Sequence, residues 1–288
     1  MKLIAALTAP AAFALIACGH VGGNAVVPTP ISPPVGALAG WASFPADHRP
    51  RPVVMILNAP PQGGFASDDG KIAALCHKFT LGVPLSQLVP AAANVTWSSG
   101  SSGTYPAISA AAALIAMKQT VTSDPSCATV RPLVITGARF AKSEYVTDRG
   151  SAQIDSWLFR VGGVSGEFSY PALAASAVWN ADMTKGLPDR GSVVSSDGRT
   201  LTFSFYGAPS TSGPCGADYR GVVAESNAAV AVALQVTSHA KPGELVACDL
   251  MAQLRSVDVT LASVLGGRVV LDASGNVTSV CPSTKPAC

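Results

Sequence analysis

Short apolar runs separated by turn residues dominate the second half of the chain. Runs rich in β-branched and aromatic residues, bounded by Gly, Pro, Asn, Asp or Ser, are typical of strands. The pattern predicts strands over residues 133–136, 156–161, 200–206, 219–224, 229–236, 256–261 and 268–272. Glycine-containing turns at residues 265–268 and 273–276 predict two tight hairpins.

The part of the chain before residue 130 predicts helices as well as strands. Residues 52–57 are a continuous apolar run, which fits a buried strand, and residues 94–97 fit the end of another. Ser67 offers an N-cap for a short helix toward Cys76. Pro106 suits a first helical turn, and the alanine-rich residues 107–119 predict the best helix in the chain. We therefore predict an α+β fold, predominantly antiparallel β sheet with a few short helices and stabilising disulfides.

The first residues have the parts of an export signal. Lys2 precedes residues 3–17, which carry no charge and are fewer than the about 20 apolar residues of a spanning helix. The run Leu15-Ile16-Ala17-Cys18 resembles the lipobox of bacterial lipoproteins, in which the signal is cut before the cysteine and its sulfur receives a diacylglycerol. This resemblance implies a signal peptide over residues 1–17 and a lipid anchor at Cys18 that holds the protein to the bacterial cell membrane, outside the cytoplasm. An ordinary secretory signal that contains a cysteine is the alternative.

The composition after Cys18 suggests a tether and then a folded body. Residues 18–40 contain prolines and glycines but no Asp, Glu, Lys or Arg, a composition typical of an extended spacer. We expect ordered structure from near Trp41, with an α+β domain over residues 41–195 and a mostly β domain over residues 196–288. The polar, glycine-containing residues 186–198 favour that boundary. One continuous domain is the alternative.

Six cysteines remain once Cys18 is set aside, and an even number indicates disulfides in an oxidising compartment. They are Cys76, Cys127, Cys215, Cys248, Cys281 and Cys288. Pairing sequence neighbours would join Cys76 to Cys127, Cys215 to Cys248 and Cys281 to Cys288, but the sequence does not choose among the possible pairings. No C-x-x-C spacing occurs, so we expect no metal, and no motif calls for a cofactor.

The charge balance excludes one class of partner. Charged residues make up 12% of the chain, and the formal net charge is +2 at pH 7. No basic cluster stands out, so we expect no nucleic-acid partner.

Motifs that would specify a reaction are absent or incomplete. No G-x-S-x-G elbow, H-E-x-x-H site, phosphate loop or dinucleotide fingerprint occurs. Ser238 and Lys241 satisfy S-x-x-K, but Pro242 follows at once, which favours a loop over the helix that the motif needs. None of the histidines has neighbours that mark a catalytic base. They are His20, His48, His77 and His239.

The one candidate for a ligand-binding groove is a tryptophan with arginines on both sides of it in the sequence. Alternation along residues 154–161 would put Trp157 on the face opposite Arg160, with Arg149 a few residues earlier. Arg149, Trp157 and Arg160 could line a groove for a ligand. A half-buried core tryptophan with solvated charges around it is the commoner arrangement.

Several segments of the chain carry a further resemblance. They are residues 148–150, 156–159, 215–219, 225–226, 257–261 and 265–272, with Cys248. Together they resemble secreted and lipid-anchored proteins of high-GC Gram-positive bacteria for which no activity is known. The resemblance implies an extracytoplasmic location and a bond between Cys215 and Cys248.

Two classes of function stay open on the sequence. We favour a non-enzymatic lipoprotein of the cell envelope whose body binds an unknown envelope protein or a small ligand. The alternative is an extracytoplasmic hydrolase of envelope material whose catalytic groups come together only in the fold. A pocket that brings His77 or His239 to a serine and a carboxylate would favour the hydrolase.

Overall fold

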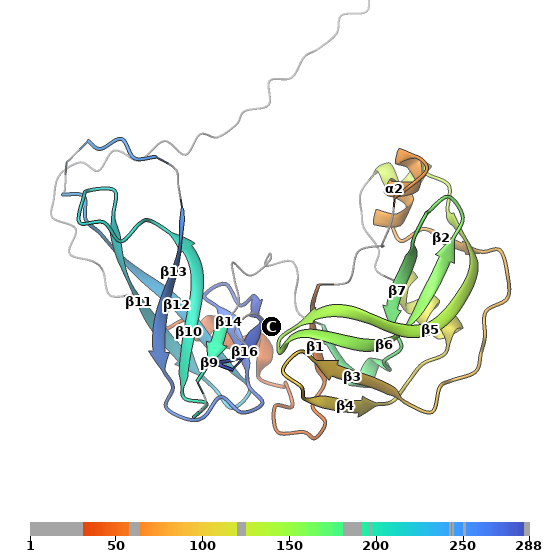
Figure 1. The fold of residues 1–288 in the computed structure, drawn as a ribbon, viewed down its shortest axis with the longest axis horizontal. Coiled ribbons are helices and arrows are strands. Elements are labelled where there is room, and N and C mark those ends of the chain that lie inside the picture. Colours follow the sequence, from red (N-terminus) through yellow and green to blue (C-terminus); the bar gives the residue numbers. More distant parts are fainter. Residues whose placement is uncertain are drawn as a thin grey trace, which may run out of the picture.

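The chain folds into two groups of sheets that lie side by side (Figure 1). The computed structural model describes residues 31–57, 64–119, 125–180, 192–195, 197–241, 243, 245–249 and 252–284. Within them an eight-stranded sheet contains the strands of residues 53–180, and two four-stranded sheets contain those of residues 192–282. The fold is α+β, dominated by sheet and stabilised by disulfides, as the sequence predicts.

The N-terminal lobe is built on the eight-stranded sheet. Its strands are β1 Val53–Leu57, β2 Phe79–Leu81, β3 Ala93–Trp97, β4 Ser102–Tyr105, β5 Leu133–Thr147, β6 Gly150–Val161, β7 Glu167–Pro171 and β8 Val178–Asn180. Its helices are α2 Asp68–Leu75, α3 Ala110–Lys118, α4 Ser126–Thr129 and the short 3-10 helix η2 Ala175–Ala177. The strand order is β4-β3-β6-β5-β1-β8, with β2 also paired to β5 and β7 also paired to β6.

A long antiparallel hairpin of β5 and β6 forms the middle of this sheet. Its residues pair from Thr147 opposite Gly150 to Ile135 opposite Val161. The register shifts once, between Ile135 and Gly137. The sequence predicts only residues 133–136 of β5, because beyond them charged residues occupy both faces of the strand. The apolar alternation that identifies a half-buried strand is therefore missing there.

The C-terminal lobe is a sandwich of two four-stranded sheets. One sheet contains β9 Ser192–Val194, β10 Thr200–Gly207, β13 Gln253–Thr260 and β16 Val280–Pro282, and the other contains β11 Ala217–Glu225, β12 Ala229–Ser238, β14 Val269–Asp272 and β15 Val277–Thr278. Phe203 and Phe205 of the first sheet pack against Val230 and Val232 of the second. Where β11 passes β13, a Cβ at Gly221 would lie 2.1 Å from a methyl carbon of Val259, so this close approach requires glycine.

A separate apolar core joins the two lobes. The helix α1 Val35–Leu38 and the 3-10 helix η1 Ala39–Trp41 bury Leu38 and Trp41 against β12 and β14, and Val54 and Ile56 of β1 complete the cluster. This packing corrects the predicted end of the tether at Gly40. An uncharged, apolar segment suits a core as well as a spacer, so composition alone did not separate the two.

The predicted helices form with one change of boundary. Ser67 caps α2 as predicted and accepts a hydrogen bond from the backbone N–H of Gly70. The alanine-rich helix α3 begins at Ala110, after the N-cap Ser109, and not at Pro106. The carbonyl of Pro106 instead accepts a hydrogen bond from the N–H of Ala174, which holds this residue beside the extended chain after β7.

Only one of the two predicted hairpins forms. Residues 273–276 connect β14 to its antiparallel neighbour β15, as predicted. Residues 265–268 do not form a hairpin, because β13 and β14 belong to different sheets. Gly267 meets a different requirement there: a Cβ on it would lie 2.1 Å from the carbonyl oxygen of Ala46 at the lobe junction.

Disulfides tie down the ends of elements in both lobes. Cys76 pairs with Cys127, joining α2 to α4, and Cys215 pairs with Cys248 beside β11. Cys281 is also disulfide-bonded, while Cys288, its predicted partner, lies outside the described residues. Such bonds are typical of an oxidising, extracytoplasmic compartment.

The N-terminal predictions cannot be compared with coordinates. The signal, Cys18 and the first part of the tether lie outside the described residues. Among the residues that are described, no helix is long and apolar enough to cross a membrane.

Candidate functional site

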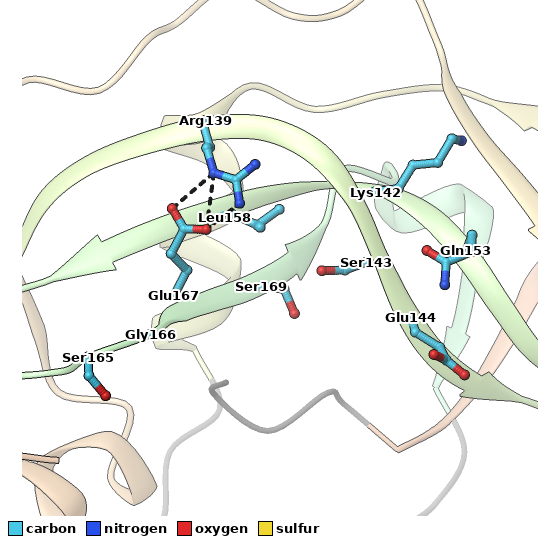
Figure 2. Close-up of a pocket in the computed structure, with 10 residues that line it drawn as sticks. All are labelled: Arg139, Lys142, Ser143, Glu144, Gln153, Leu158, Ser165, Gly166, Glu167 and Ser169. Atoms are coloured by element: carbon cyan, nitrogen blue, oxygen red, sulfur yellow. Dashed lines mark hydrogen bonds and ion pairs between the residues drawn. The ribbon is translucent and has the colours of Figure 1, made fainter. Parts of the chain in front are cut away.

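A polar hollow of about 520 Å³ lies on the sheet formed by β5, β6 and β7 (Figure 2). This volume is in the range of small-ligand sites. Its lining is mostly hydroxyl, amide and charged side chains: Arg139, Lys142, Ser143, Glu144, Gln153, Leu158, Ser165, Gly166, Glu167 and Ser169.

Strand pairing fixes the positions of these side chains. Arg139, Leu158 and Ser169 lie directly opposite one another on β5, β6 and β7 and so share one face of the sheet. Leu158 is the one large apolar side chain of the lining. Eight of the ten lining residues belong to the hydrogen-bonded ladders of β5, β6 and β7, and Ser165 and Gly166 lie in the bend before β7.

An ion pair closes one end of the hollow. The Nε of Arg139 lies 3.0 Å from each carboxylate oxygen of Glu167, and its Nη2 also binds Oε2 (Figure 2). The hydrogen bond to Glu167 raises the pKa of Arg139. This pair bridges β5 and β7 across β6, and it neutralises the charge of both groups.

A second pair neutralises Lys142. Its Nζ lies 3.0 Å from Asp155, which also accepts hydrogen bonds from the backbone N–H and side-chain amide of Asn94. Burial acts to raise the pKa of Asp155, but the hydrogen bonds from Asn94 and Lys142 outweigh it and hold that pKa below its ordinary value. Glu144 is then the lining carboxylate that has no hydrogen bond or ion pair to the described residues.

The predicted groove residues do not come together. Trp157 is 8% exposed, packs against Phe140 and donates its indole N–H to the carbonyl of Ile108, so it is a core residue. Arg149 lies in the turn after β5, whereas Arg160 is exposed near the other end of β6. Arg160 follows Arg149 by eleven positions, about 36 Å along an extended strand, which is too far for one small ligand.

Arg149 belongs instead to a cluster of buried charges at the lobe junction. Arg51 and Asp148 form a buried ion pair, and Arg149 lies 3.5 Å above the ring of Trp97. Burial, followed by the nearby positive charge of Arg51, lowers the pKa of Arg149. The carbonyl of Asp148 accepts a hydrogen bond from Val280, so this cluster joins the β5–β6 turn to the C-terminal lobe.

His239 has a carboxylate partner, but its hydrogen bonds are wrong for a base. Its Nε2 lies 2.9 Å from Asp218 and its Nδ1 lies 2.7 Å from the carbonyl oxygen of Thr211. Hydrogen bonds to these two acceptors raise the pKa of His239. Because both ring nitrogens face these acceptor oxygens, neither nitrogen is directed at the hydroxyl of a serine nucleophile.

The other candidates from the sequence lie away from the hollow. Ser238 ends β12, and no helix follows it among the described residues, as expected for a loop. His77 follows α2 next to the Cys76 disulfide, and His48 precedes β1. His20 is outside the described residues. No group of three or more His, Cys, Asp or Glu within the described chain is arranged to hold a metal ion.

Comparisons with known proteins do not identify the site. No protein-family model, no curated protein and no solved structure matches the chain. The resemblance to lipid-anchored proteins of high-GC Gram-positive bacteria therefore stays a prediction.

Sequence reasoning missed most of the hollow. The sequence pattern singles out neither Glu167 nor the β5 residues Arg139, Ser143 and Glu144. The available signal was weak: residues 138–147 alternate without an apolar face, which is consistent with a strand exposed on both sides. The pairing with β6 and β7 that gathers these side chains depends on contacts remote in sequence.

Proposed function

We propose that this protein is a lipid-anchored, extracytoplasmic binding module of the cell envelope, with no enzymatic activity, and that the β5–β6–β7 hollow is its binding site. The hollow carries the proposal: most of its polar side chains are held on paired strands, Arg139 and Lys142 each form an ion pair, and the carboxylate of Glu144 has no partner among the residues that the structure describes. Such a lining suits a hydrophilic ligand that forms hydrogen bonds and carries a cationic group.

The location is supported by two independent features. The lipobox-like run that ends at Cys18 predicts acylation there, and buried acyl chains contribute about 0.8 kcal/mol of membrane affinity per CH₂ group. The disulfides of the folded body suit the same compartment.

The anchor is tested by Cys18→Ser. We expect this substitution to release the protein from the membrane fraction and to abolish incorporation of labelled fatty acid. Full membrane retention of the variant would refute the anchor.

The binding site is tested by filling the hollow. The full chain with Cys18→Ser is screened by thermal shift against free amino acids, short synthetic peptides and cell-wall sugar fragments. Stabilisation by a member of the panel should disappear in Ser143→Trp and persist in Ser256→Trp, a matched change at an exposed strand position of the other lobe. Equal loss in both variants, or no stabilising compound, would refute the assignment of the hollow. Mass spectrometry of the same mixtures would reveal turnover, which would favour the hydrolase.

A further inference from the structure

Among the residues that the structure describes, one edge of β5 has no partner strand over most of its length. Along its other edge β5 pairs with β6 throughout. On the open side, β2 pairs only with Leu133 to Ile135, and β1 pairs only with Val146 and Thr147. Residues 136–145 have no strand partner on this side within the described chain, and β1 and β2 flank the gap at its two ends (Figure 1).

The backbone groups of such an edge can form hydrogen bonds with a further strand. In an antiparallel pair, successive residues direct their N–H and C=O groups alternately toward the partner strand and away from it. Half of the residues in 136–145 therefore present unpaired backbone donors and acceptors along about 33 Å of edge. An extended polypeptide is the ligand that satisfies such a row, as in strand addition.

The hollow adjoins this edge. Arg139, Lys142, Ser143 and Glu144 lie within the open stretch and line the hollow as well. Arg139 and Ser143 belong to the face of the sheet that carries Leu158 and Ser169, and Lys142 and Glu144 belong to the opposite face. Successive side chains of an added strand would point alternately to these two faces. Main-chain hydrogen bonds would then supply affinity, while the hollow would select side chains.

We propose that an extended segment of a partner protein adds to β5 between β1 and β2 and inserts side chains into the hollow. This inference rests on the proposed binding function and names its ligand. Because Glu144 has no partner within the described part of the chain, while Arg139 and Lys142 are neutralised by Glu167 and Asp155, a lysine or arginine of the segment is expected at Glu144. A second copy of this chain fits less well, since antiparallel pairing about the centre of the open stretch places Gly137, and not a lysine or arginine, opposite Glu144.

The first experiment selects the ligand. A phage-displayed library of linear heptapeptides is selected on the full chain carrying Cys18→Ser, with the Ser143→Trp variant as the counter-target. Enriched peptides should bind the control variant Ser256→Trp and fail to bind Ser143→Trp. They should also contain Lys or Arg, and Glu144→Gln should weaken their binding about tenfold. If no peptide is enriched, the proposal of strand addition is refuted. The thermal-shift screen then still tests the proposed binding function independently.

Backbone methylation then distinguishes strand addition from simple occupation of the hollow. The best peptide is made in two forms, N-methylated at its odd or at its even positions. One form should lose at least about tenfold in affinity, because its methyl groups replace the N–H groups that face β5, and the other should bind nearly as well as the parent. Equal behaviour of the two forms would overturn strand addition while leaving the hollow as a binding site.

Amide hydrogen exchange observes the edge directly. In the free protein, N–H groups at alternate positions of residues 136–145 should exchange rapidly, and the bound peptide should protect them. Protection in the free protein would show that the edge is already occupied and would overturn the proposal. Light scattering measures the oligomeric state of the same samples. A dimer that the peptide does not dissociate would show that the edge serves self-association and would overturn the proposal.

Discussion

The two lobes use their strands in opposite ways. In the C-terminal sandwich each sheet buries one face against the other, and Phe205 and Val230 lie in a dry core. In the N-terminal lobe the middle of the β5–β6 hairpin extends polar side chains into a hollow and leaves one backbone edge open. The two kinds of strand thus have different sequence patterns: the strands of the sandwich alternate apolar and polar residues, whereas β5 loses that alternation beside the hollow.

Truncating one aromatic residue in each lobe tests this contrast most strongly. Phe205→Ala should lower the free energy of unfolding by about 3–5 kcal/mol, because Phe205 is 2% exposed between the sandwich sheets. Phe140→Ala should cost about 1 kcal/mol or less, since Phe140 is 41% exposed. Urea titration followed by circular dichroism measures both variants. Similar losses would mean that the hairpin carries as much of the stability as the sandwich.

Removing one disulfide from each lobe has the next largest effect. Replacing both cysteines of either pair by Ser should cost about 2–4 kcal/mol, through the greater chain entropy of the unfolded state. The Cys76–Cys127 bond spans 51 residues and the Cys215–Cys248 bond 33, so loop entropy alone predicts a difference of only a few tenths of a kcal/mol. Unfolding in urea tests this near-equality, and a gap of several kcal/mol would show that strain or local packing outweighs loop entropy.

The smallest effect is a pH dependence confined to the C-terminal lobe. Deprotonation of His239 removes a donor from Asp218 or from Thr211, with Arg255 as the nearby cation. Because the folded-state pKa is raised, the stabilisation is complete below the unfolded value of about 6.5 and is lost as the pH rises through the folded-state pKa. Hydrogen exchange of residues 208–216 should therefore accelerate from pH 5 to pH 8, beyond its intrinsic pH dependence, in the wild type but not in His239→Gln. An identical pH dependence of hydrogen exchange in the variant would exclude a stabilising role for the His239 hydrogen bonds.

The sandwich could be predicted from the sequence much better than the hairpin. Predicted strands 200–206, 219–224 and 229–236 match β10, β11 and β12 to within a few residues, because apolar alternation and turn residues mark them locally. The prediction of a hairpin between β13 and β14 was wrong, because a glycine pair indicates a tight turn or a close contact equally well. At Gly267 the reason is the carbonyl of Ala46, more than 200 residues away in sequence.

The candidate site was largely beyond prediction for a related reason. Trp157 stood out by residue type, yet its indole binds Ile108 within the core. Arg139 and Ser169 became site residues only through the register of β5, β6 and β7, which no local pattern specifies. The unpaired edge of β5 is a property of the strand order, so it was invisible until that order was known.

The junction between the lobes has a consequence for the order of events during synthesis. Alternate residues of β12 serve different cores: Ala231 faces α1 and β1, while Val232 faces the sandwich. The last described strand, β16, pairs with β9, and Val280 donates its N–H to Asp148. A chain that emerges N-terminus first would expose the apolar side of β1 until β12 and β14 arrive, and it would complete the junction only after β16 has emerged. The open edge of β5 would therefore need protection from wrong partners throughout this interval, which gives its charged side chains a use before any ligand is bound.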